Sequence, residues 1–235
     1  MYIKKRASGF IQRNGVPVYG STKLIPQPVS NLISQWTFDA SNGVDTANSY
    51  DLYTNAGTPT YGAGQVNTCL VLDGSSNMTN TAYYSGFTTQ ITMAFWYKCS
   101  AQTSDGGVII VDDSIPVSHI PAYYILIGGS KWEFRHLPWA GWFPGPDATV
   151  DNNWHFIIVQ NNNGAYEMWE DNVSIGTLSP SILYPGLTPG NYIKVGGYVN
   201  NPTYNFKGSL DQIRIYNKIL TSGERSALWN GGAGI

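Results

Sequence analysis

Apolar and polar residues alternate through much of the chain, in short runs that glycine, proline and asparagine interrupt. A period of two is typical of strands with one buried face, and short runs bounded by turn residues favour strands over helices. The unbroken apolar run at 154–159 predicts a strand that is covered on both faces. The full pattern predicts strands at residues 32–38, 123–127, 132–134, 154–159 and 208–216.

The alternation in residues 208–216 predicts on which face of a strand one acidic residue lies. A regular strand there places Asp211, Ile213 and Ile215 on one face and Leu210 and Arg214 on the other. A carboxylate on an apolar face is costly unless N–H donors, a hydroxyl or a cation satisfy it. We therefore expect Asp211 to have a dedicated partner.

One short helix is predicted near the end of the chain. Thr221 followed by Glu224 has the spacing of a capping box, and Leu220 stands at the hydrophobic-staple position. Gly231 and Gly232 end the helix about two turns later.

Two residue pairs predict tight hairpin turns. Asn163-Gly164 and Asp171-Asn172 both tolerate the positive φ angles that two-residue turns require. We expect strands to reverse direction at both pairs.

The composition favours one large β-rich domain. Apolar residues make up 42% of the 235 residues, which is enough for a sizeable core, and 26 glycines with 13 prolines favour strands and turns. No apolar stretch approaches the roughly 18 residues that a membrane-spanning helix needs, so no membrane partner is expected. Two cysteines, Cys69 and Cys99, are too few for a disulfide scaffold, and buried free thiols are favoured over a bridge.

Charge divides the chain near residue 31. Residues 1–31 hold five basic and no acidic residues, whereas residues 32–235 hold eight basic and fifteen acidic residues, a formal charge of -7. Such asymmetry predicts an extended arm that contacts a different partner surface from the one that the body contacts. Five cations interspersed with prolines are few for nucleic-acid binding, so nucleic acid is not the expected partner. The expected attachment residues are Lys4, Lys5, Arg6, Phe10, Ile11, Arg13, Val18 and Tyr19.

A family resemblance rests on motifs that follow one another along residues 32–232. They are Trp36-Thr37-Phe38-Asp39, the segments 64–74 and 91–98, the Trp154-His155 pair that begins a buried strand, and the run 193–229. In this order they resemble laminin G-like domains of the concanavalin A-like lectins and glucanases. The resemblance implies an all-β, two-sheet antiparallel jelly-roll sandwich with a short C-terminal helix. It also implies a binding or adhesion platform, which hosts enzymes only when a specific set of carboxylates is added.

The chain departs from the family between about residues 100 and 146. Aromatic residues gather here among glycine and proline, and residues 138–146 are expected to form a surface loop. Exposed indoles suit sugar rings or a protein interface, and the alternative is a plug that folds back over the end of the sandwich. The candidate ligand-binding residues are Trp132, Trp139 and Trp142.

Two aspartates are candidates for calcium. Some laminin G-like sandwiches carry Ca²⁺ near the ends of their first and last strands, and Asp39 and Asp211 occupy such positions. Calcium needs six to eight oxygen ligands, which carbonyl groups of residues 39–51 would have to supplement. The other interpretation has Asp211 accepting main-chain N–H bonds and Asp39 capping the turn at residues 40–43. The sequence weighs the two equally.

The acidic residues argue against catalysis. Retaining glycosidases need a nucleophile and an acid about 5 Å apart, which sandwich enzymes supply from alternate positions of one strand. The four glutamates, Glu133, Glu167, Glu170 and Glu224, do not form that pattern, and the spacing of Glu167 and Glu170 places them on opposite faces of a strand. No catalytic residue is predicted.

We interpret the chain as a non-enzymatic virion surface protein, such as a phage head decoration or a head or tail fibre component. The arm would bind capsid or tail proteins. The sandwich would present an adhesive surface, and its candidate ligand is a host-surface glycan. A homo-oligomer is also compatible with the sequence. The alternative is a free carbohydrate-binding module of a bacterial cell-surface or secreted system, although residues 1–13 lack the apolar region of an export signal. A glycoside hydrolase ranks third.

Overall fold

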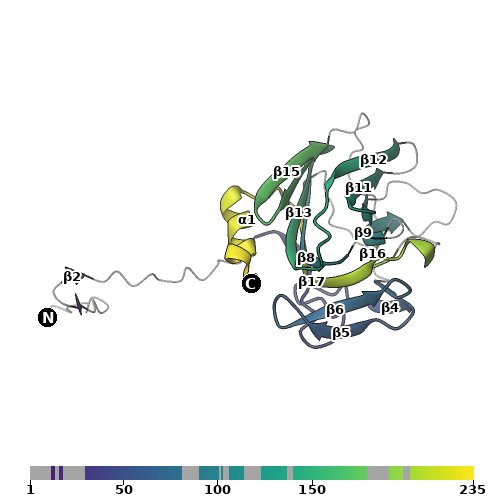
Figure 1. Ribbon diagram of the computed structural model, residues 1–235, viewed down its shortest axis with the longest axis horizontal. Helices are drawn as coiled ribbons and strands as arrows, with labels where there is room; N and C mark the ends of the chain where they lie inside the picture. The colour runs from purple at the N-terminus through teal and green to yellow at the C-terminus, as the bar shows by residue number, and fades with distance from the viewer. Residues whose placement is uncertain are drawn as a thin grey trace.

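Two antiparallel sheets pack face to face in the computed structural model (Figure 1). The structure describes residues 12–13, 16–17, 30–80, 90–100, 102, 106–113, 123–136, 140–178, 191–197 and 202–235. The expected two-sheet sandwich is confirmed, and a short α-helix follows the last strand.

The first sheet has eight strands, and β17 lies at its centre. Along the sheet the order is β15 (Val173–Leu178), β14 (Ala165–Glu170), β13 (His155–Asn162), β8 (Gln90–Lys98), β17 (Lys207–Tyr216), β6 (Thr68–Asp73) and β5 (Thr60–Ala63). The eighth strand, β3 (Leu32–Trp36), pairs with the second half of β17.

The second sheet has seven strands. Their order is β12 (Ala140–Asp147), β11 (Lys131–His136), β10 (Tyr123–Gly128), β9 (Gly106–Asp113), β16 (Asn191–Val195), β7 (Asn77–Thr79) and β4 (Tyr53–Ala56). A separate two-stranded sheet joins β1 (Gln12–Arg13) to β2 (Val16–Pro17) within the predicted arm. The remaining elements are α1 (Ser222–Trp229) and two 3-10 turns, η1 (Pro202–Tyr204) and η2 (Asn230–Gly232).

Aromatic side chains hold the two sheets together. Trp132 of β11 meets the ring of Tyr97 edge to face at 5.0 Å between centroids and that of Phe95 at 6.3 Å, so the second sheet contacts β8 of the first. Trp132 is 0% exposed. Such edge-to-face pairs add to the apolar area that each ring buries.

The strand β17 is not regular, and this corrects the expected faces. Leu210, Ile213 and Ile215 all lie in the core between the sheets, because a bulge at Asp211 and Gln212 inserts one extra residue. Gln212 adopts φ of 48°, as a bulged residue can. Asp211 therefore shares the outer face with Trp96, its partner on β8, and does not lie beside Ile213.

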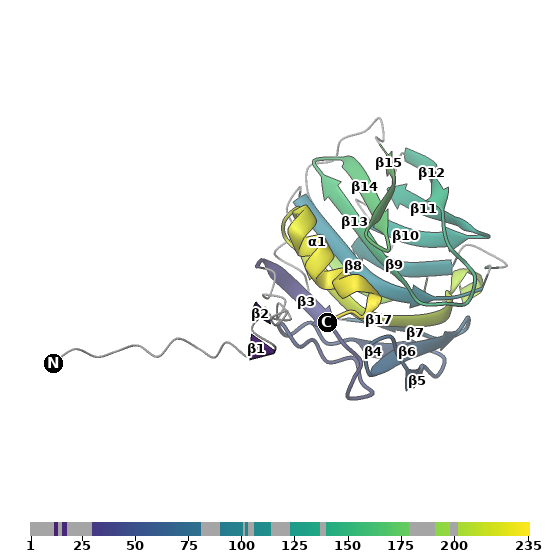
Figure 2. The ribbon, with the colours of Figure 1, turned by 60° about the vertical axis from the view of Figure 1, so that its left-hand side comes forward.

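Helix α1 lies on the outer face of the eight-stranded sheet (Figure 2). The predicted capping box is confirmed, with Thr221 accepting the N–H of Glu224 and Glu224 accepting the N–H of Thr221. The helix ends at Trp229 and is capped by Asn230, whose φ of 50° is left-handed, just before the predicted glycines. Leu228 completes a second apolar cluster, which also contains Ala94, Trp96, Phe156, Ile158, Tyr216 and Leu220.

The expected loop at residues 138–146 is wrong for residues 140–146, which belong to β12. Pro144 and Pro146 interrupted the strand pattern in the sequence. The structure accommodates them because β12 is the edge strand of its sheet, where a missing N–H breaks no ladder. Residues 137–139 lie outside the described residues.

Both predicted hairpin turns are confirmed. Asn163 and Gly164 have φ of 53° and 93°, and Asp171 and Asn172 have 49° and 65°. Cys69 and Cys99 are buried free thiols, as expected. Within the described part of the chain, no helix has the length and apolarity to cross a bilayer.

Gly196 is predicted to be essential for the junction after β16. Its φ is 78°, and an added Cβ would overlap Leu72 Cδ1 in the core. Gly196→Ala should lower the free energy of unfolding by at least about 2 kcal/mol, measured by urea denaturation, because strain and overpacking add. Gly223→Ala is the matched control: it meets open space within α1 and should stabilise by about 0.5–1 kcal/mol. Equal effects of the two substitutions would contradict the described junction.

Candidate functional site

One row of paired positions crosses the seven-stranded sheet from edge to edge. The register pairs Trp142 with Arg135, Arg135 with Tyr124, Tyr124 with Ile110, Ile110 with Lys194, Lys194 with Thr79, and Thr79 with Tyr53. Directly paired positions share a face of a sheet. We call these seven positions the cross-strand row.

The cross-strand row lies on the outer face of its sheet. Ile193 and Val195 are in the core between the sheets, so Lys194, which stands between them in β16, is on the opposite face. Met78 fixes the face of Thr79 in the same way. At the edge strand β4, Tyr53 is 56% exposed.

The residue types in the row combine aromatic rings with positive charge. Positions 142, 124 and 53 carry Trp, Tyr and Tyr, and positions 135 and 194 carry Arg and Lys. Aromatic rings with polar edges stack on the apolar faces of sugars, while cations and hydroxyl groups bind carboxylates and sugar hydroxyls. Of these positions, Tyr53 is 56% exposed, whereas Lys194 is 8% exposed and is therefore buried although it stands on the outer face.

The structure separates the three tryptophans that the sequence grouped together. Trp132 is wrong as a ligand-binding residue, because its side chain fills the core against Tyr97 and cannot reach a ligand. Trp142 belongs to the cross-strand row through its pairing with Arg135. Trp139 lies outside the described residues, as do most of the attachment residues; of these, Arg13 alone is placed, in β1.

Asp211 and Asp39 both accept hydrogen bonds from main-chain N–H groups of residues 66–68, where the chain passes from β5 into β6. Asp211 Oδ2 accepts the N–H of Val66 at 2.8 Å, and Asp39 Oδ1 accepts that of Thr68 at 3.2 Å. The expected N–H bonding of Asp211 is thus confirmed, whereas Asp39 binds residue 68 and not the turn at 40–43. Burial raises the pKa of Asp211 to about 7, although the N–H groups of Val66 and Gln212 lower it and Asp39 raises it further.

These contacts also test the two aspartates as calcium ligands. Asp211 Oδ1 is buried and has no hydrogen-bond partner, which leaves one oxygen for a cation. However, N–H donors occupy the other oxygen and Asp39 Oδ1, and no group of three metal-binding side chains occurs among the described residues. The donor set is too small for calcium without main-chain oxygens. Calcium at this place stays a prediction.

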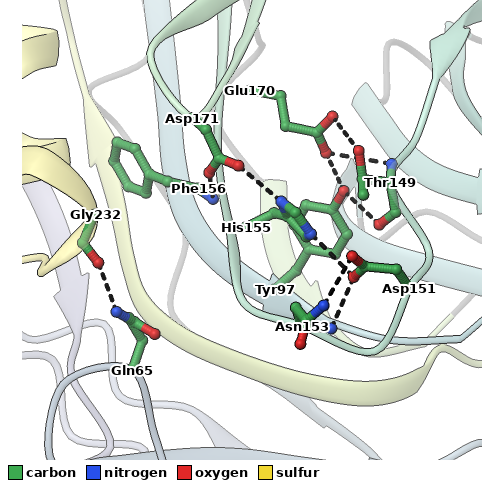
Figure 3. A network of polar contacts seen from close by, with 10 residues as sticks. All are labelled: Gln65, Tyr97, Thr149, Asp151, Asn153, His155, Phe156, Glu170, Asp171 and Gly232. Carbon is green, nitrogen blue, oxygen red and sulfur yellow. Dashed lines mark hydrogen bonds and ion pairs between the residues drawn. The ribbon is translucent and has the colours of Figure 1, made fainter.

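A polar network surrounds the start of β13 (Figure 3). His155 lies between two carboxylates, with Nδ1 2.7 Å from Asp171 Oδ2 and Nε2 3.1 Å from Asp151 Oδ1. Asp171 Oδ1 also accepts the N–H of Phe156, and Asn153 donates two hydrogen bonds to Asp151. The network ties the loop before β13 to the hairpin turn after β14.

The pKa values of His155 and Asp151 reflect the hydrogen bonds in this network. Burial opposes the charged form of His155, but the hydrogen bonds to Asp171 and Asp151 outweigh it and raise its pKa. The hydrogen bonds from Asn153, with help from His155, lower the pKa of Asp151 to about 2. These contacts therefore favour the protonated form of His155 in the folded protein.

Glu170 has a structural role beside this network. Its Oε1 lies against the hydroxyl of Tyr97, and its Oε2 accepts a hydrogen bond from Thr149 Oγ1 at 2.9 Å. Burial, and then the Glu170 carboxylate, raise the pKa of Tyr97 well above its usual value. Glu167 points the other way and is exposed, as the strand spacing predicted.

His155 should make stability depend on pH. Its pKa is higher in the folded protein than the usual 6.5, so its contribution is complete below about pH 6.5 and is lost as the pH rises through the folded value. This contribution to the unfolding free energy, measured by urea denaturation from pH 5 to 9, should amount to about 1 kcal/mol or less, because the pair is partly exposed. His155→Gln should make the decline smaller without abolishing it, because Asp211, whose pKa is raised to about 7, also loses stability as the pH rises toward 7. The same pH profile in both proteins would contradict the assignment.

Comparison with known proteins places this geometry in a family. Residues 72–224, more than half of the chain, match the model of the concanavalin A-like lectin/glucanases superfamily. A search among curated proteins finds no match.

Solved structures share the fold at low sequence identity. Domain 4 of AbnA, a GH43 extracellular arabinanase from Geobacillus stearothermophilus in complex with arabinotriose, has a TM-score of 0.68 and 17% identity; the match covers 87% of this chain and 98% of that domain. The ligand-binding domain of botulinum neurotoxin serotype D, in complex with N-acetylneuraminic acid, has a TM-score of 0.63 and 14% identity, covering 86% of this chain and 51% of that one. Trypanosoma rangeli sialidase, in complex with the inhibitor DANA, has the same score and identity, covering 88% and 34%.

The family match, the two antiparallel sheets and the capped C-terminal helix lead to one conclusion: the chain belongs to the concanavalin A-like lectin/glucanase superfamily.

Proposed function

We propose that the protein is a non-enzymatic adhesion protein that binds an oligosaccharide along the cross-strand row. The observation that carries this proposal is the register, which aligns three aromatic and two cationic positions on one outer face. Seven strands at about 4.8 Å spacing give a row on the order of 29 Å long. Such a row suits a chain of sugar rings better than a single ring.

The other outer face supports this choice. Helix α1 and its apolar cluster cover the middle of the eight-stranded sheet, so β8, β13 and β17 present no open platform there. Two similar structures were solved with arabinotriose and with N-acetylneuraminic acid. Those ligands belong to those proteins, and they favour a glycan as the class of ligand for this fold.

The positions of three glutamates favour binding over catalysis. Glu170 contacts the hydroxyl of Tyr97 through Oε1 and accepts a hydrogen bond from Thr149 through Oε2. Glu224 caps α1 and forms an ion pair with Lys218 at 2.7 Å. Glu167 lies on the opposite face of its strand from Glu170. A retaining glycosidase needs two carboxyl groups about 5 Å apart beside a sugar, and these three residues do not supply such a pair.

We further propose that residues 1–31 attach the sandwich to a larger assembly, with a phage capsid or tail as the favoured partner. The support is the charge of this segment, five basic and no acidic residues, against the acidic body. Extended segments attach by adding strands to a neighbour and by inserting apolar side chains. A cell-surface or secreted carbohydrate-binding module is the alternative setting for the same sandwich.

Removing either end of the cross-strand row should weaken glycan binding. Trp142→Ala and Tyr53→Ala should each lower affinity for a glycan selected on an array by roughly two- to tenfold, since a stacked aromatic ring contributes about 0.5–1.5 kcal/mol. Val173→Ala is the matched control, because Val173 is a 65% exposed apolar residue on the other sheet. Unchanged affinity in both aromatic variants, or no glycan bound by the intact protein, would refute the proposal.

Deleting residues 1–29 should separate attachment from folding. Asn31 would remain, and its main-chain oxygen accepts the N–H of Asn217 at 2.9 Å, so the thermal unfolding curve should keep its midpoint. The truncated protein should no longer copurify with the particle or surface that holds the full chain. Normal copurification of the truncated protein, at an unchanged melting temperature, would show that attachment lies elsewhere.

A further inference from the structure

The β4 end of the cross-strand row carries an exposed apolar surface. Tyr53 and Val44 are 56% and 47% exposed, and together with Val173 on the other sheet they are the large apolar side chains most open to solvent in the described part of the chain. Apolar side chains that gather on a surface with polar neighbours mark binding sites. We call Asn42, Val44, Asp51 and Tyr53 the β4 patch.

The core beneath the β4 patch fixes its two apolar side chains. The N–H of Leu52 donates to the main-chain oxygen of Gly43 at 2.7 Å, so residues 42–44 run beside residues 51–53. Leu52 is 3% exposed, and Gly43 is buried so closely that an added Cβ would overlap Leu52 and Met78. Because neighbouring residues of an extended chain point to opposite sides, Val44 and Tyr53 face outward next to this buried pair.

Three polar side chains at the β4 end each use only one of their two polar atoms within the protein. Asn42 Oδ1 accepts the N–H of Val44 at 3.1 Å, and Asp51 Oδ1 accepts a main-chain N–H at 2.9 Å. Asn55, two residues beyond Tyr53 in β4, donates through Nδ2 to a buried side-chain amide at 2.8 Å. Among the described residues, the second atom of each side chain has no further partner. Sugar hydroxyls both donate and accept, so a free amide N–H2, an amide oxygen and a carboxylate oxygen suit them.

The charge around the β4 patch is negative. Residues 24–97, which form β3 to β7 and most of β8, hold four aspartates and no lysine, arginine or histidine. Along the cross-strand row the cation closest to Tyr53 is Lys194, which lies two strands away and is 8% exposed. A sugar carboxylate placed on Tyr53 would therefore meet the carboxylate of Asp51 with no exposed cation from β4 or β7 to offset the repulsion.

We propose that the β4 patch binds one end of the oligosaccharide and that this end is an uncharged sugar. The inference rests on the proposed glycan binding along the cross-strand row and adds the class of the ligand, a neutral glycan and not a sialylated or uronate-terminated one. Tyr53 stacks on the apolar face of the ring, Val44 extends that contact, and the free polar atoms bind the ring hydroxyls. Repulsion from Asp51 supplies the specificity, because it acts against an acidic competitor alone.

A glycan array probed with the full-length protein tests the inference. Each oligosaccharide backbone should be present in three forms, which end in a neutral hexose, in the corresponding hexuronate or in sialic acid. The neutral form should bind at least about fivefold more tightly at about 50 mM salt, where repulsion between charges is weakly screened. Equal or tighter binding of an acid-terminated form would overturn the inference.

Asp51→Asn isolates the charge from the shape of the β4 patch. The variant keeps an oxygen that can accept the main-chain N–H, and it should narrow the preference for the neutral form to about twofold or less. Glu167→Gln is the matched control, because Glu167 is an exposed acidic residue in β14 of the other sheet, and it should leave the preference unchanged. The same preference in both variants would contradict the role of Asp51.

Salt gives the same test without a substitution, in case Asp51→Asn does not fold. Between about 50 mM and 500 mM NaCl the preference for the neutral form should shrink towards equality, while the affinity for the neutral form changes by less than about twofold. A preference that salt does not alter would refute exclusion by charge.

Amide chemical shifts separate this inference from the proposed function. A neutral glycan should shift the amide signals of residues 42–44 and 51–55. A glycan that shifts signals of β11 and β12 but none of these residues would refute binding at the β4 patch and leave binding along the row standing. No binding to any glycan on the array would refute both.

Discussion

The packing of α1 against the eight-stranded sheet decides which surfaces of this sandwich can meet a partner. Leu228 from the helix joins Trp96 and Tyr216 from the sheet in an apolar cluster that water does not reach. Because a two-sheet sandwich buries one face of each sheet, only two outer faces remain, and the helix covers the middle of one. The seven-stranded sheet presents the other outer face, on which Tyr53 is 56% exposed and Lys194 is 8% exposed.

A single extra residue in β17 has consequences on the covered side. The bulge at Asp211 and Gln212 keeps Ile213 in the core but turns Asp211 toward Val66 and sets Arg214 beneath a pocket. A regular strand would place these polar groups elsewhere, since one residue of shift reverses every side chain. The same bulge thus accounts for the N–H bond that Asp211 accepts and for the position of Arg214 on the outer face.

Local signals in the sequence predicted the local structure well. The capping box of α1 and the turns at Asn163 and Asp171 are confirmed because each depends on residues a few positions apart. The strand β12 was missed because its prolines exclude a central strand but not an edge strand, and the sequence does not say which strand is the edge. The bulge in β17 was missed because Gln212 carries no glycine signal.

The candidate sites were harder to predict, for a physical reason. Trp132 and Trp142 lie ten residues apart, yet one fills the core and the other stands in an edge strand. The cross-strand row brings together residues between positions 53 and 194, and only the pairing of distant strands aligns them. Residue types indicated a binding surface, whereas its location required the register.

The most direct measurement of the central claim is the position of a bound oligosaccharide, located in a crystal of the complex or by mapping of amide chemical shifts. The account predicts that the glycan lies across β12, β11, β10, β9, β16, β7 and β4, with the largest shifts at positions of the cross-strand row. A glycan bound over α1, or contacts confined to strands of the eight-stranded sheet, would contradict it.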